Sequence, residues 1–164
     1  MIILGIDPGY GITGFGVIEK TNNGVKCLDY GVIETPKNET LPVRLAMLYE
    51  SLVSLIKKYN VDEIALEELF FAKNTKTAIQ VAEGRGVIAL ASIQHCGRIF
   101  EYTPMQVKLA LTGQGRAEKT QVEFMVKAIL GIDKKIRPDD ASDALAIALC
   151  HSQTNPVFKD DFAF

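Results

Sequence analysis

Short apolar runs alternate with longer stretches of helical periodicity along this chain. Runs of strand length, with apolar or alternating character, cover residues 1–6, 13–19, 24–34, 63–67 and 98–103. Apolar residues recur every three or four positions at 41–59, 75–95, 105–111, 117–130 and 140–151. Glycines around Pro8 let the chain reverse between the first two strands. Three consecutive strands followed by alternating helices and strands predict an α/β domain.

The helix at 41–59 connects the third strand to the strand at 63–67. Long crossovers of this kind are right-handed and lay the new strand parallel to one already present, most simply the first. We therefore expect a five-stranded mixed sheet flanked by helices. Strands 1–3 form an antiparallel meander in it, and strands 4 and 5 run parallel to strand 1.

The first strand ends in a carboxylate, Asp7, followed by the turn sequence Pro8-Gly9. The hairpin leaves Asp7 at an edge of the sheet, facing open space. A carboxylate on a buried strand costs free energy unless a metal ion or a basic group pairs with it. Asp-Pro-Gly is also ordinary turn chemistry. The stretch by itself leaves both interpretations open.

Three further carboxylates can join Asp7. Glu67 ends the fourth strand, and Asp140 and Asp143 share one face of a helix that is otherwise almost wholly apolar. The helix dipole also favours acidic residues in a first turn, and the neighbouring Asp139 leaves one position ambiguous. Gathered carboxylates repel unless cations compensate them, and oxygen ligands select Mg²⁺ or Mn²⁺. Two such ions can hydrolyse a phosphodiester.

Composition indicates one globular domain. The chain has 164 residues and 48% hydrophobic content, enough for one core. We expect a nuclease domain at 1–152 and a short tail at 153–164 of a kind that is often disordered. Neither a run long enough for a membrane span nor a charged leader is visible, so we expect a cytoplasmic protein without a membrane partner. The three cysteines form no pair that indicates a disulfide framework or zinc site.

Charge is unevenly distributed along the chain. The formal net charge is −2, but residues 68–127 hold eight Lys and Arg against five Asp and Glu. A locally positive surface beside an acidic site is compatible with a phosphate backbone, although this signal is weak. Small residues also recur in the helix at 75–95, at Ala78, Ala82, Gly86 and Ala89. That small face can pack on the sheet of its own chain or form a homodimer seam.

Six motifs occur in a characteristic order, at residues 3–9, 67–74, 84–87, 106–108, 117–119 and 140–146. With these motifs the chain resembles the RuvC family of Holliday-junction resolvases, within the ribonuclease H-like superfamily. The resemblance implies a homodimeric crossover junction endodeoxyribonuclease for recombination and repair. Such an enzyme nicks two opposing strands of a four-way DNA junction symmetrically and works with a RuvA-RuvB branch-migration complex.

The resemblance also implies roles for individual residues. The catalytic and metal-binding residues would be Asp7, Glu67, Asp140 and Asp143, holding two Mg²⁺ ions per site, with Mn²⁺ as the alternative. DNA-binding residues would be Phe70, Lys73, Arg85, Lys108 and Lys119. Phe70 would stack on a base, and Lys108 and Lys119 would contact phosphates. The acidic tail at 158–162 does not suit DNA binding.

Three alternatives remain at this point. Another ribonuclease H-like nuclease with a different nucleic-acid substrate would carry the same carboxylates. A non-catalytic junction-binding module would use them only for a structural cation. An actin-like or sugar-kinase-like domain also begins with a strand, Asp-x-Gly and a glycine-rich hairpin, but those proteins need two such lobes.

Overall fold

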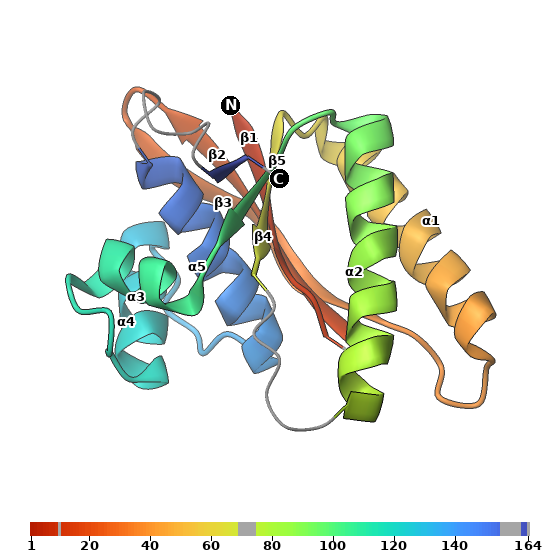
Figure 1. Cartoon of the computed structure of the whole chain (residues 1–164). Helices are drawn as coiled ribbons and strands as arrows, with labels where there is room; N and C mark the ends of the chain where they lie inside the picture. Colours follow the sequence, from red (N-terminus) through yellow and green to blue (C-terminus); the bar gives the residue numbers. More distant parts are fainter. Residues whose placement is uncertain (10, 69–74, 155–161, 164) are drawn as a thin grey trace.

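The five predicted strands form one mixed sheet in the computed structural model, which describes residues 1–9, 11–68, 75–154 and 162–163. The strands are β1 (Ile2–Asp7), β2 (Ile12–Thr21), β3 (Gly24–Glu34), β4 (Glu63–Glu67) and β5 (Ile99–Tyr102). Their order across the sheet is β3-β2-β1-β4-β5, with β1, β2 and β3 antiparallel and with β4 and β5 parallel to β1 (Figure 1). The predicted topology is confirmed.

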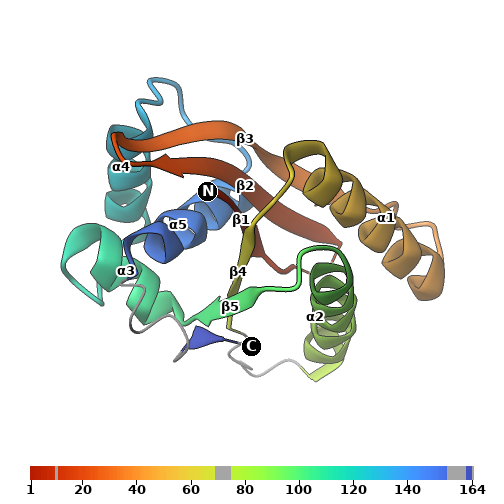
Figure 2. The ribbon, with the colours of Figure 1, turned by 90° about the horizontal axis from the view of Figure 1, so that it is seen from above.

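Helices cover both faces of this sheet. The helices are α1 (Leu41–Tyr59), α2 (Thr75–His95), α3 (Pro104–Thr112), α4 (Lys119–Leu130) and α5 (Asp139–Gln153). Helices α1 and α2 lie on one side, and α3, α4 and α5 lie on the other (Figures 1 and 2). Each side has its own apolar core, centred on Leu52 and Ile88 in one and on Leu145 and Ile147 in the other. Within the described residues, no helix combines the length and apolar character that a membrane span needs.

Helices α1 and α2 have the predicted bounds, whereas α3, α4 and α5 differ by one or two residues. Local hydrogen bonds explain where α3 and α4 begin. Helix α3 begins at Pro104 because Thr103 and Gln106 cap it reciprocally, with bonds of 3.2 and 2.8 Å. Helix α4 begins at Lys119, two residues later than predicted, because the backbone N–H of Glu118 donates to Gln121 at 2.8 Å. Helix α5 begins one residue early, at Asp139.

Asp7 lies at the end of the central strand rather than along a lateral margin of the sheet. The helix that crosses behind this strand is α5, and it approaches unusually closely. A Cβ atom on Gly5 would lie 2.1 Å from the carbonyl oxygen of Ala144, and one on Gly14 would lie 2.1 Å from that of Asp140. Glycine at both positions therefore lets the backbone of α5 rest on β1 and β2, which brings its acidic first turn beside Asp7.

The small residues of α2 do not pack on the sheet as a set. Ala82 and Gly86 are exposed, whereas Ile88 and Ala91 face the core. Exposed apolar side chains accompany the small residues, since Ile79, Leu90 and Ile93 are 61%, 49% and 55% accessible. The outer face of α2, defined by these five exposed residues, is thus an apolar surface of the single chain.

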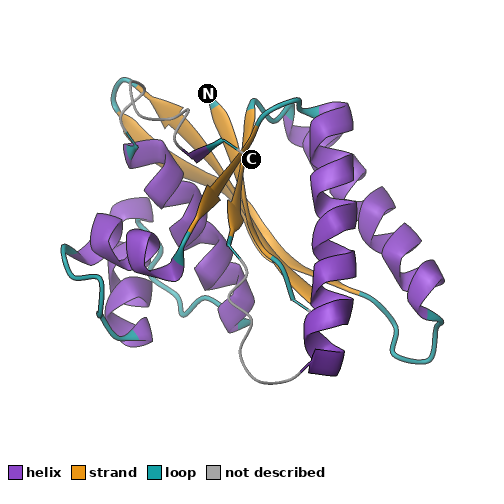
Figure 3. Cartoon of the chain, viewed as in Figure 1, coloured by secondary structure: helices purple, strands orange, loops and turns teal. Residues whose placement is uncertain are grey.

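The last described residues, 162 and 163, lie against β5, which is one of the two edge strands of the sheet (Figure 3). Phe162 stacks on Tyr102 with ring centroids 5.1 Å apart. Ala163 forms an antiparallel bridge with Phe100. Residues 155–161 lie outside the described part of the chain.

Candidate active site

Two carboxylates lie side by side because two neighbouring strands are parallel. Strand β1 pairs with β4 in a register that sets Ile6 opposite Leu66, so the residues that follow, Asp7 and Glu67, end adjacent strands at the same edge. Their carboxyl groups share a hydrogen bond. The convergence predicted from the two strand ends is present.

Helix α5 brings the remaining carboxylates. Asp140 and Asp143 are both half-buried, and the charge of each raises the pKa of Asp7. Asp139 is exposed and is held by Arg137 at 2.7 Å. The charge of Asp140 therefore acts on Asp7, whereas Asp139 pairs with Arg137 and lies 4.0 Å from Lys119. The contacts favour Asp140 over Asp139 as the third acidic group.

Burial makes this cluster electrostatically costly. Desolvation, together with the charges of Glu67 and Asp143, raises the pKa of Asp7 from 3.8 to about 8. Burial also raises the pKa of Glu67, an effect that its hydrogen bond to Asp7 opposes. The pair thus holds a proton near neutral pH, with the Asp7 carboxyl donating to Glu67. A divalent cation at this place would replace that proton.

Lys119 supplies positive charge to the cluster from the first residue of α4. Its ammonium group donates to Asp143 at 2.7 Å and lies 4.0 Å from Asp139. Burial lowers the pKa of Lys119, but the hydrogen bond to Asp143 and the charges of Asp143, Asp139 and Asp7 together outweigh it, so the net shift is upward. Burial raises the pKa of Asp143 while Lys119 opposes that rise. Lys119 is therefore a charged partner of the acidic cluster.

The donor chemistry of the cluster suits a hard divalent ion. All four candidate ligands are carboxylates, the ligand type that Mg²⁺ and Mn²⁺ prefer. As the side chains stand, no three Asp, Glu, His or Cys groups of the described residues form an arrangement that holds an ion. The shared proton of Asp7 and Glu67 and the ammonium of Lys119 supply the compensation instead. The four carboxylates therefore fit a site that would hold divalent cations.

A cleft of about 190 Å³ opens beside the carboxylates between α3, α4 and α5. Its charged lining is Glu67, Lys108, Lys119 and Asp143. Its apolar lining is Pro104, Val107, Val122, Ala146 and Ile147. The sequence analysis did not predict these apolar walls. The sequence does hold one signal for them, because Ile147 lies four residues after Asp143 and so on the same side of α5. The cleft is wide enough for part of a nucleotide to approach the carboxylates.

The predicted DNA-binding residues have different surroundings. Lys108 and Lys119 line the cleft, where basic groups can hold a phosphate. Arg85 is paired with Glu101 between α2 and β5 and is only 21% exposed; its contact with DNA stays a prediction. Phe70 and Lys73 lie outside the described residues.

Comparison with known proteins covers almost the whole chain. The family model described as crossover junction endodeoxyribonuclease RuvC matches residues 3–151. The protein of that name from Clostridioides difficile is 48% identical over 159 residues, which are 97% of this chain and 94% of the relative. That from Caldicellulosiruptor saccharolyticus is 50% identical over 164 residues, covering 98% and 99%.

A solved structure shares the architecture. It is that of T. thermophilus RuvC in complex with a Holliday junction substrate, with a TM-score of 0.89, 32% identity and coverage of 99% of this chain and 98% of that one. Sequence and fold therefore agree from end to end, and the chain belongs to the RuvC family of crossover junction endodeoxyribonucleases.

Proposed function

We propose that this chain resolves four-way DNA junctions by metal-dependent phosphodiester hydrolysis. It would nick two opposing strands symmetrically as a homodimer in the cytoplasm, working in recombination and repair with a RuvA-RuvB branch-migration complex. The observation that carries the chemistry is the half-buried Asp7–Glu67 pair at the ends of two parallel strands, whose raised pKa values indicate a need for positive charge. The complex of T. thermophilus RuvC with a Holliday junction supports the choice of substrate.

The carboxylates Asp7, Glu67, Asp140 and Asp143 would hold two Mg²⁺ ions, or Mn²⁺. When bound, such ions supply an activated water and stabilise the oxygen that leaves phosphorus. The side chains of the protein would position the DNA phosphate and balance the charge of the carboxylates. Asp7 and Glu67 would release their shared proton to solvent, and the Lys119 side chain would move its ammonium group from Asp143 to a DNA phosphate in the same cleft. Lys108 would hold the phosphate backbone from α3.

The outer face of α2 supports the homodimer. Ile79, Leu90 and Ile93 are exposed on a helix whose small residues Ala82 and Gly86 lie on its surface as well. Small residues allow the backbones of two helices to approach closely, and exposed apolar residues around them mark a contact surface. A symmetric dimer would present two active sites to the two opposing strands of one junction.

The central test is Mg²⁺-dependent cleavage of a synthetic mobile four-way junction. Asp7→Asn and Glu67→Gln should each slow cleavage by at least about 1000-fold, since metal catalysis supplies several kcal/mol of transition-state stabilisation. Junction affinity should stay within about threefold, because the phosphate contacts come from lysines. Duplex DNA and an RNA–DNA hybrid, assayed in parallel, separate a junction resolvase from other ribonuclease H-like nucleases.

Asp139→Asn is the matched control for this test. It removes a neighbouring carboxylate of the same helix, which is exposed and held by Arg137. We expect cleavage by this variant within about threefold of wild type. Undiminished cleavage by both Asp7→Asn and Glu67→Gln would disprove the mechanism, and preference for duplex or hybrid over the junction would disprove the substrate.

The raised pKa of Asp7 predicts how stability depends on pH in the absence of divalent ions. A folded-state pKa of about 8, above the ordinary 3.8, means that the folded protein binds more protons than the unfolded chain between these values. The contribution of Asp7 to the free energy of unfolding is therefore complete at low pH and is lost as the pH rises toward 8. Its size is on the order of 2 to 4 kcal/mol.

Urea unfolding in EDTA between pH 5 and pH 8 measures this effect. The free energy of unfolding of wild type should fall across that range more steeply than that of Asp7→Asn, which cannot titrate. Added Mg²⁺ should stabilise wild type at pH 8 and leave Asp7→Asn nearly unchanged. Parallel pH profiles for the two proteins would contradict the assignment.

The dimer prediction concerns Ile93 on the outer face of α2. Ile93→Glu would place one charge from each protomer in an apolar seam, which should weaken dimerisation by roughly 100-fold or more. Leu109→Glu on α3 is the control, because Leu109 is equally exposed, at 55%. Sedimentation equilibrium should show a monomer for Ile93→Glu and dimers for wild type and Leu109→Glu. A dimer of unchanged stability in Ile93→Glu would place the seam elsewhere.

A further inference from the structure

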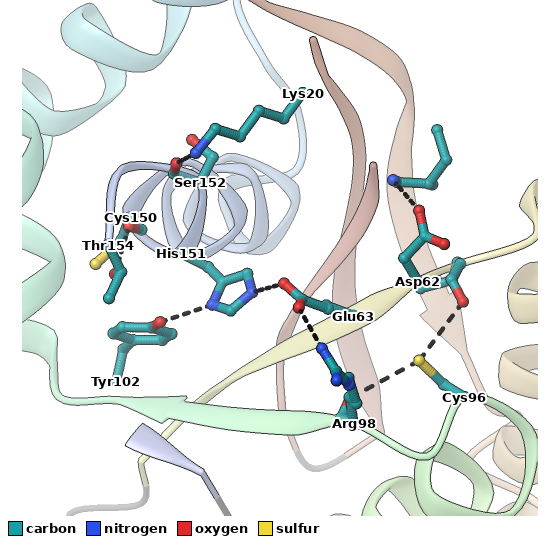
Figure 4. A network of polar contacts seen from close by, with 12 residues as sticks. Lys20, Asp62, Glu63, Cys96, Arg98, Tyr102, Cys150, His151, Ser152 and Thr154 are labelled. Atoms are coloured by element: carbon teal, nitrogen blue, oxygen red, sulfur yellow. Dashed lines mark hydrogen bonds and ion pairs between the residues drawn. The ribbon is translucent and has the colours of Figure 1, made fainter. Parts of the chain in front are cut away.

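Helix α5 and strand β4 run antiparallel and meet at both ends through polar side chains. At the cleft end, the Asp143 charge acts on Glu67. At the opposite end, His151 Nε2 lies 2.8 Å from Glu63 Oε2 in the protein interior (Figure 4). His151 is fully buried, and Glu63 is 5% exposed. The second contact has no part in the chemistry described above.

The lengths of the two elements match these contacts. The four residue steps from Glu63 to Glu67 span about 13 Å in a strand. The eight steps from Asp143 to His151 span about 12 Å in a helix. Alternate residues of a strand share a face, and residues four apart on a helix share a stripe. One face of β4 and one stripe of α5 therefore correspond residue by residue, with Ala65 and Ile147 buried in the same core between the polar ends.

The buried contact at His151 belongs to a specific network (Figure 4). The Tyr102 hydroxyl forms a hydrogen bond of 2.6 Å with His151 Nδ1, and burial raises the pKa of Tyr102 to about 12. Because a carboxylate can only accept, His151 Nε2–H donates to Glu63. Arg98 donates to the other Glu63 oxygen at 3.3 Å. The two hydrogen bonds of His151 depend on the position of α5 along the sheet.

We propose that the Glu63–His151 hydrogen bond sets the axial register of α5 on β4 and thereby places Asp143 against Glu67. His151 is thus a positioning residue for the carboxylate cluster, and this role rests on the function proposed for that cluster. Ala144 and Ala148 lie closely on Gly5, and Leu145, Ile147 and Leu149 are buried as well, but apolar contacts discriminate less sharply between neighbouring registers than directional ones do. Hydrogen bonds in a dry interior are directional and supply that discrimination.

The register hypothesis is tested with His151→Leu, which removes both hydrogen bonds of the imidazole and keeps an apolar side chain of similar size. A misplacement of about 1 Å can cost up to about 100-fold in rate. We expect the single-turnover rate of Mg²⁺-dependent junction cleavage to fall roughly 10- to 100-fold. Junction affinity should stay within about threefold, because Lys108 and Lys119 lie on other helices. The Mg²⁺ concentration for half-maximal cleavage should rise.

Three further variants make the test specific. Glu63→Gln keeps an oxygen that accepts from His151 and should cleave within about threefold of wild type. Leu149→Ala is the control for stability, since Leu149 is fully buried on the same helix; it should lower the urea midpoint at least as much as His151→Leu and leave the rate within about threefold. Tyr102→Phe keeps the ring but removes the hydroxyl, and it should slow cleavage even if His151→Leu does not fold.

A metal-free crystal structure of His151→Leu, or of Tyr102→Phe in its place, gives a readout independent of activity. It should show α5 displaced along β4 and the Asp143 and Glu67 carboxylates farther apart. Wild-type rates in folded His151→Leu or in Tyr102→Phe, an undisplaced α5, or equal rate losses in Leu149→Ala would overturn the positioning role. Failure of wild type itself to cleave the junction would instead overturn the proposed function, and the crystal structure would still decide the register.

Discussion

The energetic constraint on which this site depends is the desolvation of two carboxyl groups at the ends of adjacent parallel strands. Because β1 and β4 are parallel and Ile6 pairs with Leu66, Asp7 lies beside Glu67. Burial raises the cost of ionising both groups, and the charge of Glu67 raises that of Asp7 further, while the hydrogen bond from Asp7 partly relieves Glu67. A fold built only for stability would place apolar residues here. The raised pKa of Asp7 favours a shared proton in this pair, and bound cations would compensate its full charge.

The surrounding structure holds this costly arrangement in place. Gly5 and Gly14 let the backbone of α5 rest on the sheet, so that the acidic first turn of α5 reaches Asp7. Lys119 neutralises Asp143 from α4. At the far end of α5, the buried network around His151 ties the same helix to the start of β4. Packing thus brings the carboxylates together, and polar contacts limit where they can lie.

Much of this arrangement was predictable from the sequence. Strand and helix periodicities are strong signals, and the crossover rule alone placed Glu67 beside Asp7. The choice between Asp139 and Asp140 was not predictable, because either residue suits a first turn; the ion pair of Asp139 with Arg137 favours Asp140. The sequence also left open which face of α2 packs on the sheet, because small residues such as alanine and glycine suit a buried and an exposed helix face equally well. The Glu63–His151 contact joins residues 88 positions apart, and no local pattern signals it.

The most direct measurement is anomalous diffraction from crystals soaked in Mn²⁺ at pH 8. The account predicts two peaks about 3.5 to 4 Å apart, held by Asp7, Glu67, Asp140 and Asp143, with the Lys119 ammonium displaced from Asp143. Absence of manganese at Asp7 and Glu67, with Lys119 still bonded to Asp143, would contradict the claim that these carboxylates are assembled to bind divalent ions.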